Sequence, residues 1–383
     1  MMKTMKASIV GCGKMGQEIM NIFLDSDIEI VWLGRNLEKI EECNQIIRKR
    51  LKRIARKNGW SKEQLELRQS QIVVSFDDKD LCGSNLVIET IVENLEEKQK
   101  MFLRIEQLVT DTCILLTNTS SLPLTRVFEK VKNRTRCAGL HFFYPCTMIP
   151  TVEINYISET KQEYILYVEN MMQELGRNYI RLSEKVNMLF SKLIFILMSE
   201  AYNIYSENVV DYDQINQLSK DKFMMMGIFD MLNSTGNRIV FNCVENFIEP
   251  QDEKFYEKFK NLIFDIHFNY HDCTFLEYSS YVGREKEIKQ NLQYANEGYL
   301  QRQLYRFECL YLNYVTYLVN NGFVDSKELI CACRDILGIA KTPRELLSEL
   351  GEELVTKVLQ EELDSFPCEI FQKNDFSVWN SEA

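Results

Sequence analysis

The first half of the chain alternates short apolar runs with amphipathic stretches. Runs of this kind occupy residues 7–11, 28–33, 71–76, 86–89, 113–117, 137–141, 152–156 and 178–182. Nearly continuous apolar strands separated by helical segments are typical of a mostly parallel sheet with helices on both faces. The pattern therefore predicts an α/β fold that begins with a doubly wound sheet.

From Glu184 onward, apolar residues recur at intervals of three and four, which predicts an all-α C-terminal part. We expect a sheet domain at 1–183 with a helical arm at about 40–70, a helical domain at 184–280, a second and repeat-like helical domain at 281–363, and a tail at 364–383. Residues 200–211 and 314–325 share a helix, turn and new-helix pattern, with Asn208 and Gly322 both placed to end a helix. The pattern favours an internal duplication, although any two helical hairpins share some of it.

The composition fits an ordinary globular protein. The chain has 383 residues, 45% of them hydrophobic, and a net charge of −11, which argues against a nucleic-acid partner because phosphate recognition needs a basic surface. Its 12 cysteines include no paired CxxC modules, so we expect reduced thiols, no metal site and a cytoplasmic location. No apolar run reaches the roughly 20 residues that a membrane span needs, so no membrane partner is expected.

A glycine-rich turn follows the first predicted strand. Gly11, Gly13 and Gly16, together with Lys14 and Met15, form a G-x-G-x-x-G sequence between a strand and a helix. Such glycines permit a tight turn and let a pyrophosphate approach the helix N-terminus. The sequence therefore predicts a Rossmann-type domain that binds NAD or NADP, with these five residues at the cofactor.

Three polar residues stand at fixed intervals around the fifth to seventh strands. Ser120 lies in Asn-Thr-Ser-Ser-Leu, His141 follows 21 residues later in His-Phe-Phe-Tyr-Pro, and Glu153 follows 12 residues after that. This spacing resembles the 3-hydroxyacyl-CoA dehydrogenase family. The resemblance implies that His141 is the general base, since histidine titrates near working pH, that Glu153 orients the imidazole, and that Ser120 binds the substrate oxygen or lines the nicotinamide side. The alternative is a buried structural histidine.

The same resemblance extends to neighbouring positions and shows where this chain departs from the family. Glu93 and Lys98 stand 27 and 22 residues before Ser120 and match positions that line the nicotinamide end of the cleft, although Glu93 could also belong to a helix cap. Ser191, 50 residues after His141, replaces the asparagine of the family, and Tyr144 replaces another asparagine. These replacements predict an altered substrate position or weaker oxyanion stabilisation.

The end of the second strand predicts the cofactor preference. Gly34 stands where the family places an aspartate for the adenosine ribose, and Arg35 follows it. A guanidinium can hold a 2′-phosphate, so we expect NADP to be favoured over NAD. The alternative is that Arg35 is a solvated loop residue and NAD still binds, more loosely.

The arm contains a strongly basic helix. Seven of the ten residues from Arg48 to Lys57 are basic, and apolar positions recur among them at helical spacing. By the resemblance, Arg50 and Lys57 match positions that hold the phosphates of coenzyme A. The same cations could hold the acidic surface of an acyl carrier protein, or could form only a solvated face.

These features predict an NAD(P)-dependent oxidoreductase that interconverts a 3-hydroxyacyl and a 3-oxoacyl thioester, carried by coenzyme A or an acyl carrier protein. The alternatives are a dehydrogenase of a non-thioester hydroxy or sugar acid, and a catalytically silent nucleotide-binding protein of the same fold. By the resemblance, the helical part forms a homodimer interface, unless a second helical copy covers that surface within a monomer.

Overall fold

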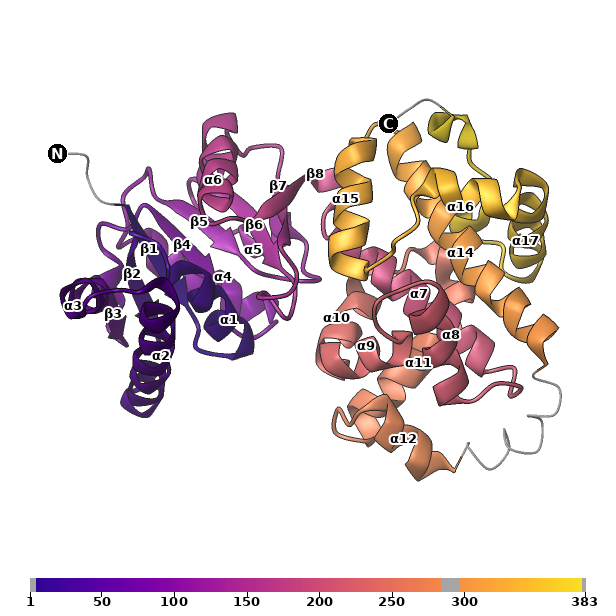
Figure 1. Ribbon diagram of the computed structural model, residues 1–383, viewed down its shortest axis with the longest axis horizontal. Helices are drawn as coiled ribbons and strands as arrows, with labels where there is room; N and C mark the ends of the chain where they lie inside the picture. The colour runs from indigo at the N-terminus through magenta and orange to yellow at the C-terminus, as the bar shows by residue number, and fades with distance from the viewer. Residues whose placement is uncertain (1–4, 284–295, 381–383) are drawn as a thin grey trace. The chain divides into compact units, whose positions relative to one another are not determined.

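The computed structural model describes residues 5–283 and 296–380 and divides the chain into two compact units, Met1–Asn187 and Met188–Ala383 (Figure 1). The sequence placed this division near residue 183. The start of the predicted second helical domain includes residues 284–295, which lie outside the described residues.

The first unit contains the sheet. Its elements are β1 (Lys6–Val10), α1 (Lys14–Phe23), β2 (Glu29–Leu33), α2 (Leu37–Asn58), α3 (Lys62–Ser70), β3 (Ile72–Ser75), η1 (Asp78–Leu81), β4 (Leu86–Glu89), α4 (Leu95–Glu106), β5 (Ile114–Thr117), α5 (Leu124–Val127), η2 (Arg134–Arg136), β6 (Cys137–Phe142), β7 (Thr151–Tyr156), α6 (Gln162–Glu174), β8 (Asn178–Ser183) and η3 (Glu184–Val186). The eight strands fall on the eight apolar runs, which confirms the predicted α/β fold with its helical arm, formed by α2 and α3.

The strand order is β3-β2-β1-β4-β5-β6-β7-β8. All neighbouring strands are parallel except β6 and β7, whose antiparallel register places His141 opposite Glu153. Because the chain passes from β3 on one side of β1 to β4 on the other, the order reverses between β1 and β4. Ligands of doubly wound sheets bind at the carboxyl ends of the strands beside such a reversal.

The core of the first unit follows the alternation of side chains along the strands. Ile9, Ile30, Ile88 and Leu140 point to one face of the sheet and form a single buried cluster with apolar residues of α1, α2 and α6. Burial of each aliphatic side chain contributes roughly 1.5–3 kcal/mol. This packing fixes the positions of the strand ends.

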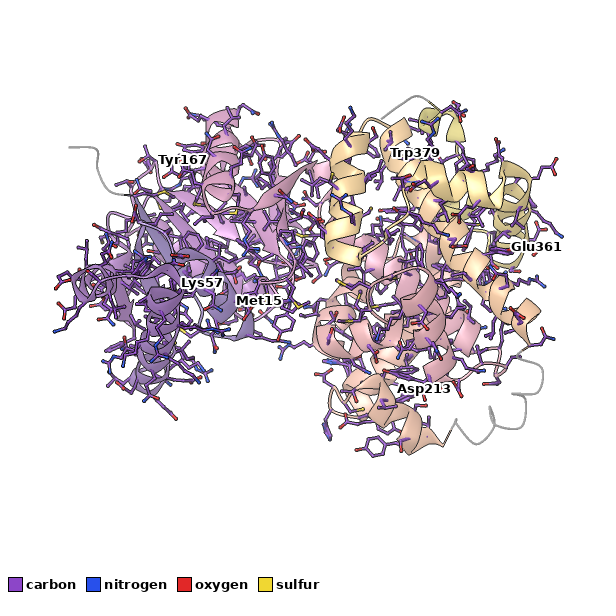
Figure 2. The ribbon with its side chains drawn as sticks, viewed as in Figure 1. Met15, Lys57, Tyr167, Asp213, Glu361 and Trp379 are labelled. Atoms are coloured by element: carbon purple, nitrogen blue, oxygen red, sulfur yellow. The ribbon has the colours of Figure 1, made fainter. Side chains whose placement is uncertain are left out.

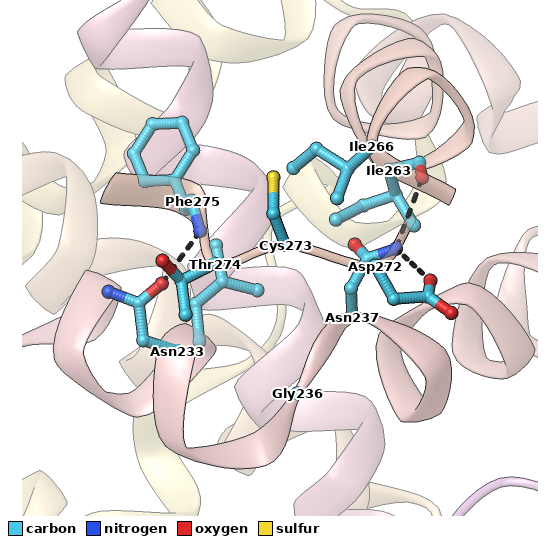
Figure 3. A pocket seen from close by; sticks show the side chains of 10 residues that line it. Asn233, Gly236, Asn237, Ile263, Ile266, Asp272, Cys273, Thr274 and Phe275 are labelled. Carbon is cyan, nitrogen blue, oxygen red and sulfur yellow. Dashed lines mark hydrogen bonds between the residues drawn. The ribbon is translucent and has the colours of Figure 1, made fainter. Parts of the chain in front are cut away.

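The second unit is helical, as the sequence predicts. Its elements are α7 (Leu189–Tyr205), α8 (Tyr212–Lys222), α9 (Ile228–Thr235), α10 (Asn237–Phe247), η4 (Pro250–Asp252), α11 (Glu253–Asn269), α12 (Phe275–Val282), α14 (Glu297–Asn320), α15 (Ser326–Leu337), α16 (Pro343–Leu350), α17 (Glu352–Ser365), η6 (Glu369–Phe371) and η7 (Phe376–Trp379). Between α9 and α12 lies a cavity of about 30 Å³ lined by Asn233, Asn237 and Phe275 among others (Figure 3). This volume corresponds to about two water molecules.

Two four-helix segments of this unit match in detail. The helices α7 to α10 and α14 to α17 follow one another with similar turns, and Asn208 and Gly322 take φ of 59° and 64° after the first helix of each segment. The third and fourth helices are joined by a single glycine, Gly236 at φ 86°, ψ 140° in one segment and Gly351 at φ 75°, ψ 141° in the other. The backbone thus repeats a conformation that L-residues rarely adopt.

The expectation of a tail at 364–383 was wrong for its described part, and residues 381–383 lie outside the described residues. Phe371, Phe376 and Trp379 are buried, and the indole Nε1 of Trp379 donates to Thr316 Oγ1 on α14 at 2.8 Å. Two short 3₁₀ turns place these rings, so the segment packs into the unit without the periodicity by which helices are recognised in a sequence.

Within the described ranges, no helix is both long and apolar enough to cross a bilayer. In the same ranges, no group of three or more potential metal ligands gathers.

Candidate active site

The turn between β1 and α1 has the geometry that its glycines predict. Gly11 has φ of +118°, and a Cβ there would lie 2.7 Å from the carbonyl oxygen of Thr90. A Cβ on Gly16 would lie 2.1 Å from the carbonyl oxygen of Gly11, whereas a Cβ on Gly13 would meet nothing within 4 Å. Gly11 and Gly16 are therefore required by packing, and Gly13 leaves open space above the start of α1.

Contacts from neighbouring strands fix this turn. Trp32 Nε1 and Thr90 Oγ1 both donate to the carbonyl oxygen of Gly11, at 2.9 and 3.2 Å. No side chain caps α1, which begins directly after Gly13. The fixed turn, the uncapped first turn of the helix and the open space at Gly13 fit the pyrophosphate of a dinucleotide.

Three further predicted cofactor residues lie around the start of α1. The ammonium of Lys14 lies 3.5 Å from the ring centroid of Tyr144, a cation–π contact between two exposed side chains. Met15 is half-buried and packs against the core cluster (Figure 2). Lys14 and Tyr144 are thus available to a ligand, whereas Met15 mainly packs against protein.

The end of β2 carries the residues expected to distinguish NAD from NADP. Gly34 is buried, and a Cβ at this position would lie 3.3 Å from Cys12 Sγ. Arg35 is exposed, and the next residue, Asn36, caps α2 by accepting from the backbone N–H of Lys39 at 3.0 Å. The cap fixes the backbone beside Arg35, whose guanidinium faces solvent.

His141 lies between a carboxylate and a hydroxyl. Its Nδ1 is 2.6 Å from Glu153 Oε2, and its Nε2 is 3.1 Å from Ser120 Oγ. Both His141 and Glu153 are buried. Because an ionised carboxylate only accepts, Nδ1 carries the proton and the lone pair of Nε2 faces Ser120. The structure therefore brings together the three residues at the predicted spacing, in the arrangement of an oriented general base.

A second carboxylate holds the turn that contains Ser120. Glu93 Oε1 accepts from Thr119 Oγ1 at 2.5 Å, from the Ser120 N–H at 2.8 Å and from the Ser121 N–H at 3.1 Å. Asn118 at the start of this turn accepts from the backbone N–H of Phe142 at 2.8 Å, which ties the turn to β6. Ser120 and His141 are thus fixed relative to each other by the backbone as well as by their own hydrogen bond.

Lys98 lies behind this turn between two carboxylates. Its Nζ is 2.6 Å from Glu89 and 3.2 Å from Glu93, and Thr117 Oγ1 donates to the other oxygen of Glu89 at 2.5 Å. Burial raises the pKa of Glu89. Burial by itself would also raise the pKa of Glu93, but the charge of Lys98 and the hydrogen bonds of the turn leave the pKa of Glu93 lowered. Burial opposes the charge on Lys98, yet the two carboxylates raise the pKa of Lys98.

The sequence placed both Glu93 and Lys98 at the cofactor, which remains a prediction, and the structure adds the protein contacts of the two side chains. Lys98 is only 1% exposed and Glu93 11%, and their charged atoms bind each other and the Ser120 turn. Sequence reasoning missed Glu89 and Thr117, which complete this network. Both are polar residues that end an apolar strand, and that position could have identified them.

The predicted thioester-binding residues differ in their surroundings. Arg50 is half-buried, and its Nη1 donates to the carbonyl oxygen of Gln17 on α1 at 2.6 Å. Burial lowers the pKa of Arg50. Lys57 is exposed near the end of α2 (Figure 2). Ser191 is half-buried in the first turn of α7 and belongs to the second unit, so its part in the site remains a prediction.

The glycine-rich turn after β1 lies where the strand order reverses. Together with the oriented histidine, it is the arrangement of a dinucleotide-dependent dehydrogenase. The family described as "3-hydroxyacyl-CoA dehydrogenase, NAD binding domain" matches residues 6–185. Residues 6–185 are thus similar to the NAD-binding domain of the 3-hydroxyacyl-CoA dehydrogenases, and the relatives and solved structures that match this chain include enzymes of that oxidoreductase type.

Individual relatives agree with this assignment. The 3-hydroxybutyryl-CoA dehydrogenase of Clostridioides difficile is 26% identical over 216 residues, which are 56% of this chain and 77% of the relative. The human mitochondrial hydroxyacyl-coenzyme A dehydrogenase is 25% identical over 236 residues, 60% of this chain and 75% of the relative. The crystal structure of 3-hydroxybutyryl-CoA dehydrogenase from Escherichia coli matches 99% of this chain and 98% of its own with a TM-score of 0.74, at 16% identity. The last comparison bears on the fold alone, and it includes the second helical segment.

Proposed function

We propose that this enzyme interconverts a 3-hydroxyacyl and a 3-oxoacyl thioester, carried by coenzyme A or by an acyl carrier protein. The observation that carries the proposal is the chain of hydrogen bonds from Glu153 to His141 to Ser120, at 2.6 and 3.1 Å. A bound nicotinamide supplies the hydride chemistry. The protein supplies the orientation and the movement of the proton.

In the oxidation direction, His141 removes the proton of the substrate hydroxyl through Nε2. The carboxylate of Glu153, 2.6 Å from Nδ1, stabilises the imidazolium that forms and keeps the lone pair on Nε2. The hydroxyl of Ser120 marks the place of the substrate oxygen, because it already lies at hydrogen-bond distance from Nε2. In the reduction direction, the same imidazolium returns the proton to the new alkoxide.

We further propose that NADP is favoured over NAD. The buried Gly34 brings no carboxylate to the end of β2, and the exposed Arg35 can reach a 2′-phosphate. In the variant Arg35→Ala we expect KM for NADPH to rise about tenfold, a typical value for one lost charge-assisted contact, while KM for NADH changes little. Equal effects on both cofactors would contradict the proposed preference.

The activity is tested by NADPH and NADH oxidation with acetoacetyl-CoA and with acetoacetyl carrier protein. His141→Gln should lower kcat by roughly two to four powers of ten, the usual contribution of a general acid or base. A matched control is His267→Gln, because His267 also pairs with a carboxylate, Asp272 at 2.7 Å, but in the second unit. Tight dinucleotide binding without His141-dependent turnover of either donor would favour another substrate or a silent nucleotide-binding protein.

For the second unit we propose that the two four-helix segments arose by duplication. The matching glycine conformations at Gly236 and Gly351 support this. Of the two predicted states, a homodimer and a monomer, the duplication favours the monomer, because one segment can cover the apolar surface of the other. Sedimentation equilibrium at micromolar concentration distinguishes the two states.

A further inference from the structure

The exposed side of α2 carries six cations in two parallel rows. Arg48, Lys52 and Arg56 form one row at intervals of four residues, and the second row consists of Lys49, Arg53 and Lys57. Residues four apart on a helix are neighbours, so the rows cover a strip roughly 14 Å long at 1.5 Å per residue. The opposite side of the helix packs into the core through Ile47 and Leu51.

These cations have no partner of opposite charge nearby. Within residues 5–283 and 296–380, none of the six forms an ion pair or a side-chain hydrogen bond, although 22 ion pairs form elsewhere in those ranges. By contrast, Arg50 lies between the rows and the core and is bonded to the backbone of α1. The strip is therefore a free, uniformly positive surface on a chain whose net charge is −11.

Stability of the helix does not account for this arrangement. Like charges four residues apart destabilise a helix, and each row contains two such pairs. The helix dipole favours cations only within the last turn, which contains Arg56 and Lys57. The remaining four cations lie earlier in the helix, where the dipole contributes little to their stability.

We propose that the strip docks the acidic surface of an acyl carrier protein, so that the thioester is delivered on a protein-bound arm. This inference rests on the proposed thioester function. A compact ligand with clustered phosphates, such as coenzyme A, can reach only part of a strip this long, whereas an acidic helix laid along α2 can meet both rows. A lipid surface fits less well because the apolar side of α2 is buried in the core and cannot enter a bilayer.

The test compares the acetoacetyl group on three carriers: a bacterial-type acyl carrier protein, coenzyme A and N-acetylcysteamine. The variant Arg48→Glu/Lys52→Glu/Arg56→Glu reverses the row that contains neither residue expected at coenzyme A. The control Lys79→Glu/Lys130→Glu/Lys132→Glu changes the net charge equally at exposed sites of the same unit off α2. Turnover of the N-acetylcysteamine thioester reports that each variant is folded.

We expect the wild type to have at least a tenfold higher kcat/KM for the carrier-protein substrate than for coenzyme A. The row reversal should remove this advantage through KM, change the coenzyme A value less than threefold, and leave kcat unaltered. High salt should have the same effect as the reversal. No advantage of the carrier protein, an equal loss with coenzyme A, or an equal effect of the control variant would overturn the inference.

Direct binding separates this inference from the proposed function. Titration calorimetry with the unacylated holo carrier protein requires no turnover. Binding that the row reversal abolishes, in an enzyme that turns over no thioester, would refute the proposed reaction and keep the docking surface. Absence of binding, or row-dependent binding to anionic vesicles in its place, would refute the docking of a carrier protein.

Discussion

Replacing Lys98 by methionine tests the network that holds the Ser120 turn. Methionine has a similar length and no charge, so Glu89 and Glu93 lose their shared cation while the packing changes little. Glu89 is fully buried and keeps hydrogen bonds from Thr117 Oγ1 at 2.5 Å and from the Ile91 N–H at 2.6 Å. Glu93 is slightly exposed and keeps the donors of the turn. The loss therefore falls mainly on Glu89.

Removing one partner of a buried ion pair typically costs about 3–5 kcal/mol. Because both carboxylates keep hydrogen bonds, we expect Lys98→Met to lower the free energy of unfolding by about 3 kcal/mol at pH 7, the low end of that range. Burial already raises the pKa of Glu89, and loss of the cation raises it further. The folded variant then binds more protons than the unfolded chain above the ordinary glutamate pKa, so the difference from wild type should shrink as the pH falls from 7 to 5.

The assay is urea unfolding followed by tryptophan fluorescence in a Trp379→Phe background, in which the two remaining tryptophans, Trp32 and Trp60, both report on the first unit. Lys100→Met is the matched control, because Lys100 lies on the same helix with a 58% exposed side chain and forms only surface ion pairs. Adding Glu89→Gln to Lys98→Met should recover part of the stability. A loss no larger than that of the control, or a difference that grows at pH 5, would refute the reasoning.

Three shorter predictions concern other parts of the molecule. Glu153→Gln keeps the shape of the side chain but removes the charge beside His141, the proposed general base, and should lower kcat by about two to four powers of ten with little change in KM. Steady-state kinetics test this, and an unaltered kcat would contradict it. Gly13→Ala should weaken dinucleotide binding at least tenfold in a fluorescence titration and leave the free energy of unfolding within about 0.5 kcal/mol of the wild-type value. Gly16→Ala should instead destabilise the fold, since its Cβ would lie 2.1 Å from a carbonyl oxygen. Burial raises the pKa of Glu308 to about 7, so this group favours folding less as the pH rises from 4.5 towards 7. Glu308→Gln should therefore raise the free energy of unfolding by up to about 3 kcal/mol at pH 8 and by little at pH 4. Denaturant unfolding at both pH values tests this.

The sequence predicts the sheet well because continuous apolar runs identify buried strands directly. It does not give the direction in which strands pair, so the antiparallel β6–β7 register that sets His141 opposite Glu153 became visible only in the structure. Spacing nevertheless identified both residues. The packed segment with Phe371 and Trp379 escaped prediction because 3₁₀ turns carry no helical periodicity.

Charged residues were the hardest to place from the sequence. A one-dimensional pattern does not show that Lys98 is enclosed between two carboxylates, or that Arg50 is bonded to the backbone of α1. Periodicity gives the side of a helix on which a residue lies, but the partner that makes burial of a charge tolerable comes from another element, as Glu89 of β4 does for Lys98.

These buried charges lie where the strands of the sheet end, at the edge that carries the candidate site. Glu89 and Thr117 end β4 and β5, and His141 lies near the end of β6, so the parallel strands deliver their polar residues to one edge of the sheet. A turn at that edge has no ladder hydrogen bonds to hold it, and Glu93 supplies substitutes by accepting from three successive residues. Burial opposes the charge on Glu93, but the charge of Lys98 and the hydrogen bonds of the turn leave the pKa of Glu93 lowered and so favour its ionised form, the stronger acceptor. The ion network therefore serves the positioning of Ser120 as well as the stability of the fold, and a variant that keeps stability but loses the charge on Glu93 should lose the alignment of Ser120 with His141.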